Sequence, residues 1–412
     1  MNEQVKTTTP AGSIEGEGSA REQLIRMARD NIEMVKADQL RLADSVMEVP
    51  ATHYYDAERW RQEIDRVFRR VPLMLALSCE VRNPGDYKTL EVCGVPVLIV
   101  RDKENEVRAY INSCSHRGAV VVTERSGNKR RFSCPYHAWT FDHSGDLVAI
   151  LSEHEVGEID RSCRGLTPLP VGERAGLVWV QINPEATLDL DTFLCGYDAL
   201  LNEFDFTNWE LFDHRTLKGP NWKIAYDGYL DLYHLPVLHR ETFGASFPNQ
   251  AIYDAWGPHQ RASSPNPELL PLEESPEADW PTDKLLEGVW TIFPHISIAG
   301  FDGGGGRGVM LSQLFPGDTP EESFTVQNYV MEKLPDTEEK RQAATEQFAF
   351  LEIVVRDEDY ATGLAQQRAI RHRDGFNMIF GRNEGGGQHF HRFLDTLLDC
   401  EDDDLPGVFA DS

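Results

Sequence analysis

The chain has 412 residues, of which 41% are hydrophobic, and its formal net charge is −28. This length and apolar content allow two domains with buried cores and argue against a chain that is disordered throughout. The strong negative charge disfavours binding to nucleic acid or to an anionic membrane surface, because it repels phosphate groups.

The cysteines and the N-terminus predict a cytoplasmic protein. No apolar run reaches the roughly 18 residues that a transmembrane helix needs, and the first 20 residues have neither the basic nor the apolar stretch of a secretory signal. Seven cysteines without an export signal indicate reduced thiols. We therefore expect metal ligands among them rather than a disulfide framework.

The patterns along the chain divide it into two domains. Residues 1–20 are rich in Thr, Gly, Ser and Glu and predict a mobile tail. Apolar positions at helical spacing over 21–43 predict an amphipathic helix, and residues 21–50 as a whole would pack on the C-terminal domain. Many short strand-like runs with turn residues predict a small β-domain over 51–180. Residues 181–412 mix both element types.

The second domain is predicted to contain an antiparallel sheet and two long helices. The helices are expected over 221–239 and over Thr337–Gln367, and the proline-rich segment Ser263–Asp283 is either an exposed loop or a lid over a pocket. Strands are predicted at Val289–Phe293, Ile296–Ala299, Val309–Phe315 and Phe324–Met331.

Two loops of the β-domain carry the strongest motif. Cys114 and His116 lie in the first loop, and Cys134 and His137 in the second, in the pattern C-x-H-x17-C-x2-H. Two thiolates suit one ferric ion and two neutral imidazoles suit a second, more reducible iron, which is the ligand set of a Rieske [2Fe–2S] cluster. A zinc site is the alternative, but zinc fingers place both cysteines in one knuckle.

A second group of metal donors occurs in the expected helix over 221–239. Asp231 and His234 would share one helical face, whereas His234 and His239 converge only if the helix is locally unwound. Pro236 lies between the two histidines and makes such a distortion plausible. Two histidines and one carboxylate are the ligand set of non-haem Fe(II) oxygenases, which keep open positions for O2.

The loop motifs, Cys-Ser-His-Arg-Gly and Cys-Pro-Tyr-His-Ala-Trp, and the stretch Tyr-Leu-Asp-Leu-Tyr-His at 229–234 resemble those of one family. It is the Rieske non-haem iron oxygenase large (α) subunits, also called the aromatic ring-hydroxylating dioxygenase family. The resemblance spans nearly the whole chain. It implies an α+β protein in which a Rieske [2Fe–2S] β-domain precedes a helix-grip (StAR-related lipid-transfer-like) catalytic domain with an antiparallel sheet.

The resemblance also implies roles for single residues. His234 and His239 would bind the catalytic iron, and Asp231 would be the bridging carboxylate that carries electrons to this iron from the cluster of a neighbouring subunit. The third iron ligand would be Asp359, with Asp357 as the alternative. The acids around it are otherwise typical of an exposed helix face.

The same resemblance predicts the partners. Electrons would come from NAD(P)H through a separate reductase, with or without a ferredoxin, since no dinucleotide-binding motif follows a predicted strand. A head-to-tail homotrimer is expected, because cluster and iron lie too far apart within one subunit of this family. The family also allows a β-subunit partner.

The expected reaction is the mono- or dihydroxylation of a small organic, aromatic substrate with O2. Oxidative N- or O-demethylation and alicyclic hydroxylation are the alternatives within the family, and a Rieske electron carrier without oxygenase activity ranks below them. From strand positions alone, the residues predicted to line the substrate pocket are Phe293, Ile296, Ile298 and Met310.

Overall fold

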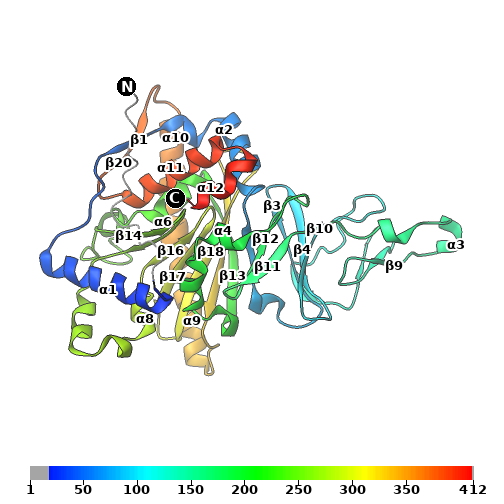
Figure 1. The fold of residues 1–412 in the computed structure, drawn as a ribbon, viewed down its shortest axis with the longest axis horizontal. Coiled ribbons are helices and arrows are strands. Elements are labelled where there is room, and N and C mark those ends of the chain that lie inside the picture. Colours follow the sequence, from blue (N-terminus) through cyan, green and yellow to red (C-terminus); the bar gives the residue numbers. More distant parts are fainter. Residues whose placement is uncertain (1–17, 411–412) are drawn as a thin grey trace. The chain divides into compact units, whose positions relative to one another are not determined.

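The structure is a computed structural model that describes residues 18–410 and forms two compact units (Figure 1). The smaller unit consists of Arg61–Phe193 and Asp205–Leu211, and the other described residues form the larger unit. The domain boundaries predicted at 51 and 180 stay predictions. The longer segment of the smaller unit begins at Arg61 and ends at Phe193. Of the predicted tail, residues 1–17 lie outside the described part of the chain.

The smaller unit is built from three antiparallel sheets, and the predicted β-domain is confirmed. The strand orders are β10-β5-β4-β3-β6, β11-β12-β2 and β7-β8-β9. Turn residues with positive φ, such as Asn105 and Gly145, separate these short strands. The strands are β2 (Leu73–Leu77), β3 (Asp86–Val92), β4 (Val95–Arg101), β5 (Val107–Ile111), β6 (Ser126–Asn128), β7 (Phe132–Ser133), β8 (Thr140–Phe141), β9 (Leu147–Ala149), β10 (Pro168–Leu169), β11 (Val171–Arg174) and β12 (Leu177–Val180).

The larger unit is organised around a seven-stranded antiparallel sheet in the order β13-β19-β18-β17-β16-β15-β14, as the expected fold class requires. A separate two-stranded sheet pairs β1 (Met47–Pro50) with β20 (Asn377–Phe380). The strands of the large sheet are β13 (Glu210–Gly219), β14 (Ile252–Trp256), β15 (His259–Ser263), β16 (Val289–Ile292), β17 (Ile296–Asp302), β18 (Arg307–Pro316) and β19 (Ser323–Met331).

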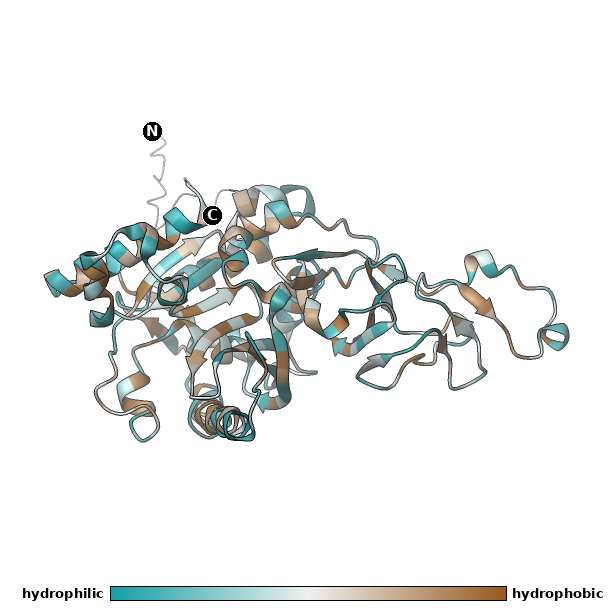
Figure 2. Ribbon diagram, turned by 90° about the horizontal axis from the view of Figure 1, so that it is seen from below, coloured by the Kyte–Doolittle hydropathy of each residue, from teal (hydrophilic) through white to brown (hydrophobic). Residues whose placement is uncertain are grey.

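Helices cover this sheet, and many single elements carry both apolar and polar segments (Figure 2). The helices that matter for the site are α6 (Trp222–Leu230), α7 (Leu235–Leu238), α9 (Glu338–Ile353), the π-helical segment η8 (Val354–Tyr360), α10 (Ala361–Ile370) and α11 (Gly385–Asp399). The long helix predicted over Thr337–Gln367 is therefore interrupted by a π-helical stretch.

The N-terminal helix α1 (Ala20–Ala37) begins at a capping box formed by Ser19 and Glu22 and ends at Asp38 in the left-handed region. It is shorter than the helix predicted over 21–43. The segment predicted as a loop or lid contains short helices, η6 (Pro267–Glu274) among them, and packs against α1, where Asn31 Nδ2 donates to the Ser264 carbonyl over 2.9 Å.

Side-chain proximity identifies the face of the large sheet that α6 covers. Helix α6 packs against β16 and β18, with the Tyr226 side chain near Thr291 on β16 and the Tyr229 side chain near Ser312 on β18. Residues paired directly across antiparallel strands share a face, and Thr291, Ser297 and Ser312 are paired in register. The face that meets α6 therefore carries a row of small hydroxyl side chains.

Candidate metal centres

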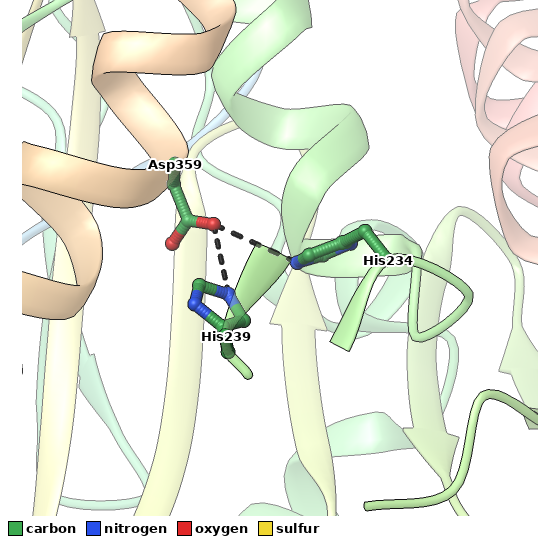
Figure 3. Close-up of side chains that lie close together, drawn as sticks. All are labelled: His234, His239 and Asp359. Atoms are coloured by element: carbon green, nitrogen blue, oxygen red, sulfur yellow. Dashed lines mark ion pairs between the residues drawn. The ribbon is translucent and has the colours of Figure 1, made fainter. Parts of the chain in front are cut away.

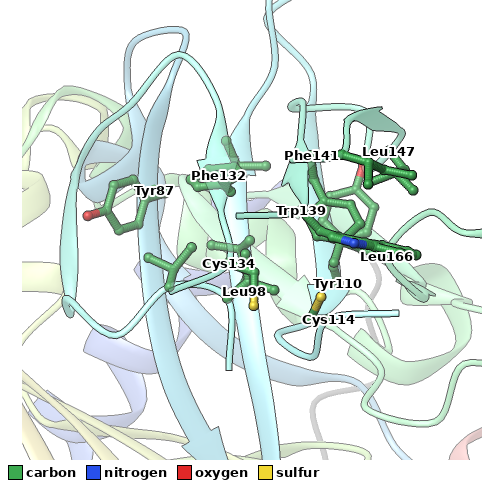
Figure 4. Close-up of a cluster of buried hydrophobic side chains, with 14 residues drawn as sticks. Tyr87, Leu98, Tyr110, Cys114, Phe132, Cys134, Trp139, Phe141, Leu147 and Leu166 are labelled. Atoms are coloured by element: carbon green, nitrogen blue, oxygen red, sulfur yellow. The ribbon is translucent and has the colours of Figure 1, made fainter. Parts of the chain in front are cut away.

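The two motif loops of the smaller unit follow β5 and β7. Cys114 and Cys134 are only 3% and 4% exposed and belong to the apolar core drawn in Figure 4. Burial raises the pKa of the Cys114 thiol, and the Cys134 side chain, which is in hydrogen-bonding contact with it, raises this pKa further. Two adjacent buried thiols become thiolates only beside a cation, and this fits an iron ion.

Both loops repeat one backbone hydrogen-bond pattern. The amide of Cys114 donates to the carbonyl five residues later, at Ala119, and the carbonyl of Cys114 accepts from the amide four residues later, at Gly118. Cys134 makes the same pair of bonds with residues 139 and 138, and all four bonds are 2.8 or 2.9 Å long. Residues 118 and 138 both have positive φ, 77° and 55°. The two loops therefore have the same local backbone conformation, and each carries one cysteine and one histidine of the motif.

The two imidazoles form a second pair beside the thiols. The ring centroids of His116 and His137 are 4.8 Å apart, and Trp139 stacks on His116 with its centroid at 4.6 Å. The buried Nδ1 atom of His137 has no hydrogen-bond partner among the described residues. An orphan ring nitrogen suits a metal ligand, and a pair of thiols beside a pair of imidazoles suits a two-iron cluster.

The second donor group lies in the larger unit, where the catalytic segment has a different shape from the one predicted. Helix α6 ends at Leu230, and Asp231 is in the extended conformation with φ −107° and ψ 114°. The chain then turns, and Pro236 stands at the beginning of the short helix α7. The expected helix over 221–239 is thus broken before His234 and not at Pro236, since Pro is well tolerated in the first turn of a helix.

The break brings His234 and His239 together with Asp359 of η8 (Figure 3). The Oδ1 atom of Asp359 is 3.0 Å from Nε2 of His239 and 3.6 Å from Nε2 of His234, and one donor atom from each of the three residues lies within 4.8 Å of the others. His239 is 2% exposed. The donor set fits a ferrous ion with open coordination positions.

Each histidine is oriented by a carboxylate on its other nitrogen. Asp231 Oδ2 is 3.0 Å from Nδ1 of His234, and Glu358 Oε2 is 2.8 Å from Nδ1 of His239. Such partners fix the tautomer that leaves Nε2 free for a metal. Burial lowers the pKa of His239, but the carboxylates of Asp359 and Glu358 outweigh burial and raise it above its usual value.

Glu358 is the functional candidate that the sequence reasoning missed. It also accepts a 2.8 Å hydrogen bond from the Thr242 hydroxyl, which lies three residues after His239. The runner-up for the third ligand, Asp357, instead forms an ion pair with Arg356 at 2.7 Å and is not part of the donor cluster. Geometry thus favours Asp359 over Asp357. A π-helical turn at a functional site is a recurring device for changing which side chains share a face.

A cavity of about 270 Å³ adjoins the iron donors and is lined by side chains from α6, α10 and β20 as well as by His234 and Asp359. The predicted pocket residues do not line it. Ile296 and Ile298 flank Ser297 on β17 and therefore face away from α6. Met310 packs under α9, and Phe293 contacts the rings of α11. This pocket prediction is wrong for the cavity next to the donors.

The histidines of the C-terminal segment, taken from the sequence as structural, lie on α11, where His391 is buried and His389 is half-buried. His389 Nε2 is 2.7 Å from the Gly257 carbonyl, and His391 Nε2 is 2.9 Å from Asp227 Oδ1. Asp227, whose role the sequence left in doubt, also accepts a 2.8 Å hydrogen bond from the Tyr54 hydroxyl. Within residues 18–410, no helix is both long and apolar enough to cross a bilayer.

The fold and the two donor sets define a class of protein: an iron enzyme with a Rieske cluster domain and a mononuclear-iron domain. Two family models match the chain, the Rieske [2Fe-2S] domain over residues 71–160 and the ring hydroxylating alpha subunit (catalytic domain) over residues 206–399. Together they span more than half of the chain. It belongs to the large subunits of the Rieske oxygenases, which are oxidoreductases that incorporate oxygen from O2.

Curated relatives support this assignment. The chain is 26% identical to the oxygenase subunit of carnitine monooxygenase from Escherichia coli (strain K12), over 84% of this chain and 92% of that protein. It is 29% identical to the oxygenase subunit of glycine betaine monooxygenase from Pseudomonas aeruginosa (strain UCBPP-PA14), over 50% of this chain and 48% of that protein. It is also 29% identical to the anthranilate 1,2-dioxygenase large subunit of Acinetobacter baylyi, over 48% of this chain and 43% of that protein.

Solved structures share the fold. A quaternary ammonium Rieske monooxygenase matches with a TM-score of 0.72 and 22% identity, covering 86% of this chain and 96% of that chain. Naphthalene 1,2-dioxygenase matches with a TM-score of 0.71 and 17% identity, covering 88% and 95%. Family membership rules against the zinc-site alternative and against a simple electron carrier, since the chain has a catalytic mononuclear-iron domain as well as the Rieske domain.

Proposed function

We propose that the protein hydroxylates a carbon bound to the nitrogen of a quaternary ammonium compound. The observation that carries this proposal is the similarity to carnitine monooxygenase, which extends over 84% of this chain. The similarity to glycine betaine monooxygenase points to the same substrate class. This replaces aromatic hydroxylation, the reaction expected first from the sequence, with one of its alternatives.

Side chains near the iron donors support a cationic substrate. The ring of Phe243 lies 5.2 Å from that of His239, and the rings of Phe247 and Phe350 lie 5.8 and 5.9 Å from Phe243. Aromatic faces attract quaternary ammonium groups. The net charge of −28 also raises the local concentration of a cation near the protein.

The reaction consumes electrons and protons as well as O2. A ferrous ion held by His234, His239 and Asp359 would supply O2 activation. For a trimethylammonium group, the balance is R–N(CH3)3⁺ + O2 + 2e⁻ + 2H⁺ giving R–N(CH3)2CH2OH⁺ + H2O. The N-hydroxymethyl product then breaks its C–N bond to release formaldehyde and the protonated tertiary amine.

A substrate panel tests the proposal. The purified enzyme, a compatible reductase and NADH are incubated with carnitine, glycine betaine, anthranilate and naphthalene under ¹⁸O2, and products are identified by mass spectrometry. We expect oxidised product from a quaternary ammonium compound and none from the aromatic compounds. Hydroxylated aromatic product alone would overturn the proposal in favour of the second candidate, which the similarity to anthranilate 1,2-dioxygenase supports.

The electron route is also part of the proposal. Cys114, His116, Cys134 and His137 would hold the cluster, which receives electrons from NAD(P)H through a reductase or a ferredoxin. Asp231 would then connect the cluster of one subunit to the iron of the next in a homotrimer. The hydrogen bond of Asp231 to His234 supports this role, and a related solved structure is described in terms of inter-subunit electron transfer.

An Asp231→Asn variant tests that route. It should keep the cluster, and with ferrous ion supplied in excess it should keep the mononuclear iron, because Asp231 is not among the proposed ligands; coupled turnover should fall about 100-fold. Stopped-flow measurement of cluster reoxidation gives the electron-transfer rate directly. Normal reoxidation in this variant would contradict the route. A cytoplasmic location and a β-subunit partner remain parts of the proposal that fractionation and co-purification would test.

A further inference from the structure

Besides Asp359, three carboxylates line the cavity beside the proposed iron ligands. Asp227 and Asp231 line it from α6 and its C-terminal end, and Glu384 lines it from the beginning of α11. His234 and Asp359, two of the proposed iron ligands, line the same cavity. Its volume of about 270 Å³ holds several water molecules. These carboxylates therefore share one water-sized cavity with two of the proposed iron ligands.

Two of the three carboxylates, Asp227 and Asp231, each make two hydrogen-bonding contacts. Asp227 accepts from the Tyr54 hydroxyl at 2.8 Å and from His391 Nε2 at 2.9 Å. Asp231 accepts from the Tyr233 amide at 2.5 Å, and its other oxygen lies 3.0 Å from Nδ1 of His234. Hydrogen bonds to a carboxylate favour its charged form.

Fewer hydrogen bonds stabilise a negative charge on Glu384. Its side chain makes a single hydrogen bond within the described part of the chain, from the Gly381 amide at 2.5 Å. Burial raises the pKa of Glu384, and the nearby charges of Asp231 and Asp227 raise it further. The side chains that β20 and α10 place in the cavity carry no charge, so no cation from these elements offsets the acids.

Ionising several neighbouring carboxylates together costs free energy, because their negative charges repel one another. A proton shared among them therefore favours the carboxylate that accepts the fewest hydrogen bonds. Every catalytic cycle of this enzyme class needs protons, since O2 combines with two electrons and two protons, either to give a hydroxylated product and water or to give a dihydroxylated product. We propose that Glu384 is the carboxylic acid that stores a proton in this cavity and releases it toward the iron site. This inference rests on the proposed iron site but not on the identity of the substrate.

In each cycle the O–H bond of Glu384 breaks and its proton passes to cavity water, and then to the oxygen that is being reduced. The electrons for this reduction come from NAD(P)H through the reductase. The Glu384 carboxylate then recovers a proton from solvent at the rim of the cavity, where Ile379 is 65% exposed. Glu384 therefore acts as a relay residue and touches neither the substrate nor the iron.

Three variants test the proposal in the holoenzyme. Glu384→Gln removes the titratable group but keeps an oxygen to accept from the Gly381 amide. Glu384→Asp keeps a carboxyl group. Glu48→Gln is the matched control, because Glu48 is exposed on β1, hydrogen-bonds to Asn377 at 2.7 Å and does not line the cavity.

The first readout is infrared absorption without substrate. Wild-type enzyme should show the C=O band of a protonated carboxyl near neutral pH, and Glu384→Gln should lose that part of the band while Glu48→Gln keeps it. Buried Asp254, whose pKa burial raises to about 6, contributes equally to all these proteins and cancels in the difference. An unchanged band in Glu384→Gln would overturn the proposal, whatever the substrate proves to be.

The second readout is the pH profile of turnover and of peroxide release. In wild type, kcat should fall as pH rises through the raised pKa of Glu384, because the proton donor is then lost. Glu384→Gln should lack this limb, lose roughly 10-fold or more in kcat and release more peroxide, and Glu384→Asp should recover part of the loss. If the limb persists in Glu384→Gln, the proposal is wrong. Failure of the quaternary ammonium proposal appears separately, in the product panel.

Discussion

The cluster loops of the smaller unit and the iron site of the larger unit hold metal donors by different means. In the loops, Cys114 and Cys134 stand on short segments that repeat one set of backbone hydrogen bonds, and the donors follow within three residues of each cysteine. In the proposed iron site, the candidate donors His234 and Asp359 are far apart in the chain, and each lies where a regular helix is interrupted.

This difference shows which interactions fix the geometry of each site. The loop geometry depends on local backbone bonds and on positive φ at residues 118 and 138. The iron-site geometry depends on side-chain carboxylates, because Asp231 and Glu358 orient the two histidine rings. We therefore expect the iron site to respond most to side-chain changes and the cluster loops to respond to backbone changes.

The largest effect should come from removing the proposed third ligand. Asp359→Ala should lose most of the mononuclear iron, so that the iron content falls from about three to about two per chain, and turnover should fall at least roughly 100-fold. The cluster absorbance should be unchanged. Metal analysis and visible spectroscopy measure both.

Asp357→Asn is the matched control for this change. Asp357 belongs to the same π-helical segment, but its carboxylate pairs with Arg356. We expect full iron content and turnover within about twofold of wild type, because an exposed ion pair contributes little. Iron loss in Asp357→Asn with retention in Asp359→Ala would reverse the ligand assignment.

A smaller effect is expected at Glu358. Glu358→Gln should weaken iron binding about 10- to 100-fold, because His239 loses the carboxylate that fixes its ring and tautomer. Competition with a chelator gives the affinity. Glu346→Gln, an exposed change on α9, should have no effect, and equal losses in the two variants would argue against an orienting role for Glu358.

The smallest effects should come from the cluster loops. Ala138 has φ +55°, which is strained for a residue with a Cβ, and Ala138→Gly should stabilise the holo domain by about 1 kcal/mol. Gly118→Ala should cost about the same, since φ is +77° there and the added Cβ would meet only the Ser113 hydroxyl at 3.9 Å. Thermal loss of the cluster absorbance measures both.

Gly300→Ala serves as the control for the loop changes. Gly300 lies on β17 without positive φ, and a Cβ there meets no atom within 4 Å. The variant should be as stable as wild type or slightly more so. If Gly118→Ala behaves in the same way, backbone conformation at residue 118 does not limit the stability of the loop.

The sequence predicted the candidate donor residues better than it predicted the backbone conformation of the segments that contain them. The spacing of His234 and His239 correctly required an irregular helix, but the break falls at Asp231, because Pro236 fits the first turn of α7. Glu358 could not be recognised, since an acid beside other acids in a helical pattern resembles a solvated face. No propensity rule signals a single π-helical stretch.

The pocket prediction failed for a different physical reason. Strand β18 is buried on both faces over almost its whole length, so its residues show no alternation of polar and apolar character. Hydropathy therefore could not tell which face of the sheet meets α6. The strand register and the positions of Tyr226 and Tyr229 against β16 and β18 decide this.

The sequence alone determined the cluster motif, the two histidines of the proposed iron site and the two-domain α+β class, because these depend on residue types at short spacing. Only the tertiary structure decided which acid meets the histidines, that Glu358 orients one of them, and that Asp227, Asp231 and Glu384 share one cavity. These contacts join segments more than 100 residues apart in sequence. Their formation depends on how the helices pack on the sheet, which local spacing does not encode.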